Sequence, residues 1–286
     1  MKTNIYMKRI LVPTDFTEEA RIALDLAIEI AQKTGATIKL VNVFEYPVAT
    51  AYTALDVGGP DPFEGEVARE MMAKNKKQLD DLAAAARERN VDIIKEVKIG
   101  NPYISISGEL KDEDVDLVVM GSKGTSGLEE VLIGSNTEKV VRHAPCPVIT
   151  IKRPVSLANI KDIVFASDFK EVSQTFMEQI KNMHQLFDAR LHFVRINTLN
   201  NFEPDSFSKK RIHNWLEKTN LSNCTTRVYN DISEEDGIIH YAEEIDADML
   251  ALGTHGRSGL GRLFSGSLAE EVVNHAKRPI WTFRIG

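Results

Sequence analysis

The sequence of 286 residues contains only two cysteines, Cys146 and Cys224. Two thiols are too few for a disulfide framework or a conventional zinc cluster, and this scarcity fits a reducing compartment. No stretch approaches the roughly 18 to 20 apolar residues that a transmembrane helix needs, and residues 1–9 lack the apolar region of a signal peptide. These absences predict a cytoplasmic protein that does not enter a membrane and does not rely on cysteine chemistry.

An excess of positive charge is also missing. The chain has 35 Lys and Arg against 42 Asp and Glu, which gives a net charge of -7. A protein that follows nucleic-acid phosphates over an extended surface needs clustered Lys and Arg. The charge balance therefore argues against nucleic acid as a partner and leaves a local phosphate pocket open. The remaining composition, with 43% hydrophobic and 27% charged residues, is that of an ordinary globular chain.

The chain contains one pattern twice. Residues 121–135 recur at 253–267, an offset of 132, and residues 10–16 recur at 163–169, an offset of 153. The first copy therefore has 21 extra residues, and because Val43 and Ile196 still match at 153, the extra length is expected at about 45–66, as a loop or lid. A repeat of this size predicts two domains, 1–153 and 154–286.

Short apolar runs alternate with segments of helical spacing in each copy. The strands expected in the first copy are 8–14, 37–44, 92–98, 116–120 and 147–152, and those in the second are 162–166, 191–196, 225–229, 249–252 and 279–285. In the first copy one helix is expected to end at Gly35, and three others are expected at 66–89, 103–110 and 135–142. This alternation predicts an α/β fold of two tandem repeats, each an open five-stranded parallel sheet with helices on both faces.

A glycine motif begins where the fourth strand of each copy ends. In the first copy Gly121 and Gly124 precede Gly134 and Ser135, which opens the next helix. Glycine loops and helix N-termini offer backbone N–H groups to anions, and ligands bind open parallel sheets at the carboxyl ends of the strands. The motif therefore predicts a site for a phosphate chain. Its spacing is neither that of a P-loop nor Gly-x-Gly-x-x-Gly.

A structural explanation of the motif remains open at this stage. Residues 135–138 and 267–270 both fit the capping-box pattern, which stabilises a helix start without any ligand. Asp15 and Asp168 follow apolar strands, where a carboxylate can accept a hydrogen bond from the backbone of Thr17 or Val172 instead of contacting a ligand. Neither Asp has a general base or a nucleophile as an evident partner in the sequence, so no catalytic residue is predicted.

The glycine spacing, together with residues 10–16 and 142–148 and their second copies, resembles the ATP-binding signature of the universal stress protein family. The resemblance covers essentially the whole chain, as a tandem member. It implies a Rossmann-like fold of the adenine-nucleotide alpha-hydrolase type and a stress-response protein that binds ATP or another adenine nucleotide, with or without Mg²⁺. The resemblance implies no residue of this chain as a metal ligand.

The resemblance also implies which residues form the two sites. In the first half adenosine would meet Pro13, Thr14 and Asp15, the base pocket would include Val43 and Met120, and the ribose and phosphates would meet Gly121, Gly124, Gly134, Ser135 and Asn136. The second-half equivalents are Ala166, Ser167, Asp168, Ile196, Leu252, Gly253, Gly256, Gly266, Ser267 and Leu268. Arg257 and Arg262 favour the second site and the Pro-Thr-Asp opening favours the first, so the sequence leaves the occupied site undecided.

The last strand of each copy is apolar and would be an exposed edge, which invites pairing. We therefore expect 147–152 and 279–284 to pair with each other, with Trp281 and Phe283 as interface anchors, so that the chain forms a pseudo-dimer. A further homodimer and unidentified protein partners stay open. Three functions compete: a nucleotide-binding regulatory module, an enzyme that is a slow ATPase or a nucleotidyl-transfer relative, and a scaffold whose nucleotide sites are vestigial.

Overall fold

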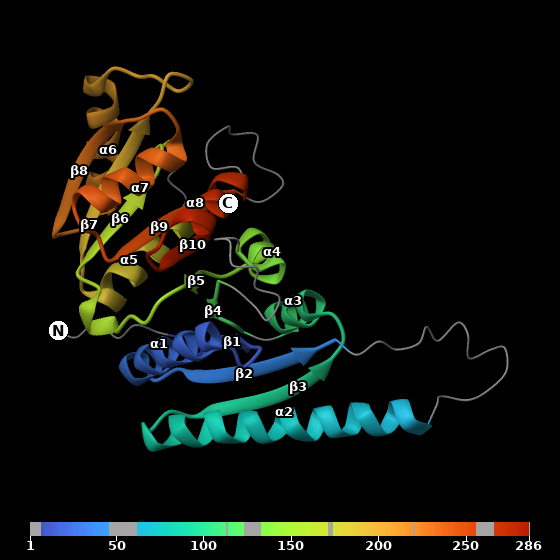
Figure 1. Cartoon of the computed structure of the whole chain (residues 1–286). Helices are drawn as coiled ribbons and strands as arrows, with labels where there is room; N and C mark the ends of the chain where they lie inside the picture. The colour runs from blue at the N-terminus through green and yellow to red at the C-terminus, as the bar shows by residue number, and fades with distance from the viewer. Residues whose placement is uncertain are drawn as a thin grey trace.

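A computed structural model describes residues 7–45, 62–112, 114–122, 133–170, 174–219, 221–255 and 266–285. The side chains of 62–65, 112, 175, 254–255, 266–267 and 284–285 are outside this description. Strands and helices alternate along both halves, as the sequence predicts (Figure 1).

The described residues of the first half form five strands and four helices. Its strands are β1 (Arg9–Thr14), β2 (Thr37–Phe44), β3 (Ile93–Ile99), β4 (Leu117–Gly121) and β5 (Val148–Ile151). Its helices are α1 (Glu18–Thr34), α2 (Pro62–Glu88), α3 (Pro102–Asp112) and α4 (Ser135–His143).

The second half repeats this order after a short 3-10 turn at Leu157–Asn159. Its strands are β6 (Asp162–Ala166), β7 (Arg190–Asn197), β8 (Cys224–Asn230), β9 (Met249–His255) and β10 (Ile280–Ile285). Its helices are α5 (Gln174–Phe187), α6 (Asp205–Thr219), α7 (Glu234–Glu244) and α8 (Gly266–His275).

All ten strands belong to one sheet, in the order β3-β2-β1-β4-β5-β10-β9-β6-β7-β8. Within each half the strands are parallel, and the same register recurs: Pro13 pairs with Val41, and Ala166, its equivalent, pairs with Val194. The α/β fold of two repeated parallel sheets is confirmed. The division into domains at 153 and 154 stays a prediction, because the sheet is continuous across it.

The two halves meet through their last strands. β5 and β10 run antiparallel, with Ile149 opposite Trp281, which confirms the predicted pairing. The Trp281 ring contacts Phe187, at 5.6 Å between ring centroids. Phe283 lies beyond the paired positions, and its ring contacts Phe165 and Phe176 of the second-half core, so its expected role as an interface anchor is wrong.

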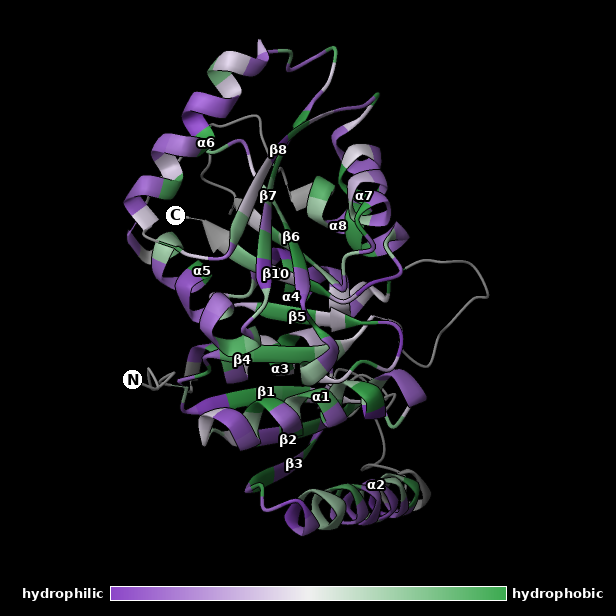
Figure 2. Cartoon of the chain, turned by 90° about the vertical axis from the view of Figure 1, so that its left-hand side faces the viewer, coloured by the Kyte–Doolittle hydropathy of each residue, from purple (hydrophilic) through white to green (hydrophobic). Residues whose placement is uncertain are grey.

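Two apolar layers cover the sheet, one on each face. Helices α1, α2, α5 and α6 contribute to one layer, and α3, α4, α7 and α8 contribute to the other. The strands are mostly hydrophobic, and in the second half α6 and α7 lie on opposite sides of them (Figure 2). No helix in the described ranges is long and apolar enough to cross a lipid bilayer.

Helix α1 shows how local sequence sets these layers. Thr17 caps its N-terminus by accepting a hydrogen bond from the Ala20 N–H, and Gly35 ends it in the left-handed region at φ 79° with its N–H bonded to the Ala31 carbonyl. Glycine reaches this conformation without a Cβ clash, which explains the predicted helix end. The caps fix α1 directly after β1, so the turn between them is rigidly placed.

Part of the extra length in the first half lies in a helix rather than in a loop. Helix α2 has 27 residues, whereas its counterpart α6 has 15. The expectation of a loop or lid over 45–66 is therefore wrong for its last residues, which begin α2 at Pro62. The rest of the candidate lid, residues 46–61, lies outside the described residues.

Replacing Ile149 by Asp should separate the halves, because Ile149 has 0% exposure and lies opposite Trp281. Burying an unpaired carboxylate there should cost at least about 3 kcal/mol of unfolding free energy. Urea unfolding measures that loss, and solution scattering should show an increased radius of gyration. Ile104→Asp, at 70% exposure, is the control and should change stability by about 0.5 kcal/mol or less. Unchanged stability and compactness of Ile149→Asp would contradict the role of the pairing.

Candidate functional site

A cavity of about 750 Å³ lies at the carboxyl ends of β1, β2 and β4. The chain runs from β1 outward to β2 and β3 on one side and then crosses to β4 on the other side of β1, so strand order reverses between β1 and β4. Loops diverge at such a point, and open parallel sheets bind their ligands there. The cavity therefore lies where the sheet topology leads a ligand to be expected.

The structure brings nine of the ten predicted first-half residues together around this cavity. They are Pro13, Thr14, Asp15, Val43, Met120, Gly121, Gly134, Ser135 and Asn136. The tenth, Gly124, lies outside the described residues. Contact of these residues with a nucleotide stays a prediction, but their convergence from four separate stretches of chain is a property of the fold.

Asp15 both lines the cavity and holds the turn before α1. Its Oδ1 accepts hydrogen bonds from the Thr17 N–H at 3.1 Å and from the Thr17 hydroxyl at 2.5 Å. The Thr14 hydroxyl accepts one from the Phe16 N–H at 3.1 Å, and Phe16 adopts a left-handed φ of 67°. The capping contact expected for Asp15 is confirmed, and it fixes the carboxylate at the edge of the cavity.

The glycine motif leads into α4 without the expected capping box. The N-cap of α4 is Gly134, which has no side chain to cap the helix, and Ser135 is already the first helical residue. The capping-box explanation of 135–138 is therefore wrong. The Gly134 N–H instead donates to the Ser122 carbonyl at 2.7 Å, and this bond closes the loop on β4. Ser135 is left to line the cavity at a helix N-terminus, where the partial positive charge favours anions.

Gly121 is required by a close approach of two backbones. A Cβ at this position would lie 2.9 Å from Cβ of Glu19 and 3.2 Å from the backbone nitrogen of Ala20. The end of β4 therefore packs directly on the first turn of α1. Gly121 has a structural reason to be glycine whatever the cavity holds.

The cavity wall also contains a set of amide side chains that was not predicted from the sequence. Asn42 donates from Nδ2 to the Thr14 carbonyl at 2.8 Å and accepts at Oδ1 from Asn75 of α2 at 2.9 Å. Gln78 and Asn101 also line the cavity. Asn42 could have been noticed as a polar residue in an apolar strand. The α2 residues could not, because only the docking of that helix brings them to the strand ends.

Two lysines also missed by the sequence line the cavity, Lys74 of α2 and Lys139 of α4. Lys139 lies one turn into α4. Its ammonium is 5.7 Å from the centroid of the Tyr103 ring. The carboxylates in the wall are Asp15 and Glu45, and Glu45 accepts a hydrogen bond from Asn101 at 3.1 Å. The described wall thus combines apolar strand ends, amides and cations beside a helix N-terminus.

The second half places its predicted residues at the equivalent strand ends. They are Ala166 at the end of β6, Ser167 and Asp168 directly after it, Ile196 in β7, Leu252 and Gly253 in β9, and Gly266, Ser267 and Leu268 in α8. Gly256, Arg257 and Arg262 lie outside the described residues, as does Val172. The turn after β6 repeats that after β1, with Phe169 at φ 57° and Asp168 accepting from the Lys170 N–H at 3.1 Å.

The thiol beside the last strand of the first half is buried. Cys146 is buried, and burial raises the pKa of its thiol to about 12, so the thiolate that binds metals is strongly disfavoured. The His143 ring packs 6.3 Å from the ring of Tyr103. No group of three or more His, Cys, Asp or Glu side chains suited to a metal occurs in the described part of the chain.

Comparison with known proteins relates the chain to one family. The model described as the universal stress protein family matches residues 7–152 and 216–284. A universal stress protein of Synechocystis is 24% identical over 291 residues, which cover 97% of this chain and 100% of the relative. One of Methanocaldococcus jannaschii is 31% identical over 151 residues, covering 53% of this chain and 85% of the relative.

The same fold occurs among solved structures. A universal stress protein of Archaeoglobus fulgidus superposes with a TM-score of 0.73 at 21% identity, covering 97% of this chain and 98% of that protein. At this identity the likeness concerns the fold alone. It extends over both halves, so the joined tandem arrangement is not peculiar to this chain.

Two glycine substitutions should have opposite effects on stability. Gly121→Ala should destabilise the chain by about 1–3 kcal/mol, because the added Cβ would overlap Glu19. Gly108→Ala is the matched control: no atom lies within 4 Å of its added Cβ in α3, and alanine should stabilise that helix by about 0.5–1 kcal/mol. Urea unfolding measures both, and a neutral Gly121→Ala would refute the close approach.

Proposed function

The chain belongs to the universal stress protein family, and we propose that it binds ATP or another adenine nucleotide in its first-half cavity, as a regulatory protein rather than as an enzyme. The observation that carries this proposal is the convergence of the predicted strand-end and glycine-motif residues around one cavity of about 750 Å³. Pockets for small ligands and cofactors commonly measure about 300–1,000 Å³.

The donor set of the cavity fits a nucleotide. Val43 and Met120 offer apolar surface for a base, and Asn42 offers an amide beside them. Ser135 and the N-terminus of α4 suit phosphates, and Lys139 adds a positive charge near them. In this proposal the strand ends hold adenosine, and α4 holds the phosphate chain, with or without Mg²⁺.

A regulatory role is favoured over hydrolysis by the engagement of the carboxylates. Asp15 holds the turn through Thr17, and Glu45 accepts from Asn101, so both described carboxylates of the wall already have hydrogen-bond donors. General base catalysis needs a base directed at an attacking water. We therefore propose at most slow ATP hydrolysis, with stress-response signalling through conformation or through protein partners in the cytoplasm.

One observation favours a second candidate, a scaffold with vestigial sites. The close approach of Gly121 to Glu19 gives part of the glycine motif a structural purpose that needs no ligand. A scaffold would keep the glycine and would have no affinity for nucleotide. The two candidates therefore differ in a direct binding measurement.

Freshly purified protein should release an adenine nucleotide when it is denatured, and chromatography with mass spectrometry would identify it. Stripped protein should bind added ATP with Mg²⁺. Release of ADP together with turnover of added ATP would favour the slow ATPase. Protein that carries no nucleotide and also ignores added ATP would contradict nucleotide binding and leave the scaffold.

Replacing Asp15 by Asn should weaken ATP binding at least about tenfold, which corresponds to about 1.4 kcal/mol. The amide still offers an acceptor to Thr17, so the turn should remain. Asp25→Ala is the control, since Asp25 lies on α1 in an exposed ion pair with Arg89. Isothermal titration calorimetry measures both affinities, and equal affinities would remove Asp15 from the proposed site.

A further inference from the structure

We infer that the second half takes up no nucleotide, because its own side chains occupy the position that corresponds to the first-half cavity. The chain would then bind one nucleotide, in the first half. This inference rests on the proposed function. It says which of the two copies of the glycine motif holds the nucleotide.

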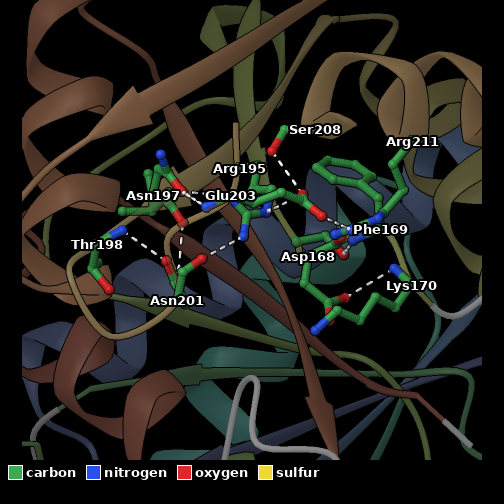
Figure 3. Close-up of polar contacts among 12 residues, drawn as sticks. Asp168, Phe169, Lys170, Arg195, Asn197, Thr198, Asn201, Glu203, Ser208 and Arg211 are labelled. Atoms are coloured by element: carbon green, nitrogen blue, oxygen red, sulfur yellow. Dashed lines mark hydrogen bonds and ion pairs between the residues drawn. The ribbon is translucent and has the colours of Figure 1, made fainter. Parts of the chain in front are cut away.

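Strand register, and not sequence alone, defines which residues of the two halves are equivalent. β1 and β2 pair as β6 and β7 do, with Pro13 opposite Val41 and Ala166 opposite Val194. The cavity-lining residues Asp15, Asn42, Val43, Phe44 and Glu45 therefore correspond to Asp168, Arg195, Ile196, Asn197 and Thr198. These second-half residues, Ile196 apart, are among those drawn in Figure 3.

Arg195 is the main difference between the two positions. It replaces the short amide of Asn42 and is only 4% exposed. Its Nη1 donates to Oδ1 of Asn197 at 2.9 Å, and its Nη2 donates to the backbone carbonyl of Asn201 at 2.8 Å. Its Nε lies 3.7 Å from a carboxylate oxygen of Glu203. A buried guanidinium thus extends over the strand end toward the chain that follows β7 (Figure 3).

The connection after β7 folds back over the same strand end. Asn201 donates from Nδ2 to the Ile196 carbonyl at 3.3 Å and to Glu234 of α7, and its Oδ1 accepts from the Thr198 N–H at 2.7 Å. Ile196 is the counterpart of Val43, whose position lines the base pocket in the proposed first-half site. The Asn201 amide therefore already occupies a backbone carbonyl that a nucleotide base would approach.

A second group of ion pairs and hydrogen bonds links the chain after β7 to α6 and to the turn after β6. Glu203 pairs with Arg211 and accepts from the Ser208 hydroxyl at 2.8 Å, while Nη1 of Arg211 donates to the Asp168 carbonyl at 3.3 Å. Burial by itself raises the pKa of Glu203, but the hydrogen bond from Ser208 and the charges of Arg211 and Arg195 outweigh it and lower this pKa. Glu203 is therefore ionised at neutral pH.

Displacing this network would be unfavourable for a ligand. Moving Glu203 away would take the nearest carboxylate from the buried Arg195, and removing one partner of a buried ion pair is strongly destabilising. Among the described residues of the first half, the corresponding place holds Asn42 and Asn75, which form a neutral amide pair along the cavity wall. The asymmetry follows from this difference in side chains, since the backbone register is the same.

Calorimetric titration of the stripped full-length chain with ATP and Mg²⁺ tests the inference. We expect one equivalent per chain, and Asp15→Asn should weaken it at least about tenfold with no tight equivalent remaining. Two equivalents in the unmodified chain, or one equivalent whose affinity falls in Glu203→Gln and not in Asp15→Asn, would overturn the inference while leaving nucleotide binding intact. No binding at all would instead refute the proposed function.

Glu203→Gln provides the matched second variant. It removes the negative charge between Arg195 and Arg211 without touching the first half. Thermal unfolding should begin at a lower temperature, whereas the affinity and stoichiometry for ATP should stay within about twofold of the unmodified chain, a change well below 1 kcal/mol. A loss of ATP affinity of tenfold or more in this variant would place the network in the binding site and overturn the inference.

Discussion

The antiparallel pairing of β5 with β10 is the contact on which the arrangement of the whole chain depends. Each half ends in an apolar strand that would otherwise be an open edge, and pairing removes both edges at once. It also brings α4 and α8 together, where Arg142 pairs with Glu270. From α8, Asn274 accepts the Ile133 N–H at 2.7 Å, immediately before the glycine that starts α4. The second half thus holds Ile133, the residue that leads into α4 beside the first-half cavity.

The two halves show how one fold supports different chemistry at equivalent strand ends. Register, turn geometry and the left-handed residues Phe16 and Phe169 are shared. The side chains at the strand ends are not, because an amide at Asn42 borders a cavity and a guanidinium at Arg195 joins a buried ion-pair network. Function is decided by such side chains and not by the fold. In our account the second half serves the first as a structural support.

The fold was largely predictable, because it follows from local patterns and from the repeat. Alternation of apolar runs with helical spacing located the ten strands, and the apolar last strands predicted their own pairing. Errors arose where a role depends on where a helix begins or how far a strand is paired. Residues 135–138 match a capping box, yet Gly134 takes the cap position. Phe283 packs into the second-half core rather than across the joint because β10 extends beyond the paired residues.

The site was predictable at the strand ends and at the start of α4, but not where α2 contributes to it. Strand-end residues such as Asp15 and Met120 follow from topology and from the family resemblance, whereas Asn75 reaches the cavity only through the docking of α2. The network around Arg195 likewise depends on the path of residues 198–204, which no motif encodes. A repeated motif therefore suggested two sites where the side chains favour one.

A crystal structure of the chain grown with ATP and Mg²⁺ would test this account most directly. We predict nucleotide at the ends of β1, β2 and β4, with its phosphates toward the start of α4, and an intact pair between Arg195 and Glu203 in the second half. Nucleotide bound at the ends of β6, β7 and β9, with that pair broken, would contradict the account.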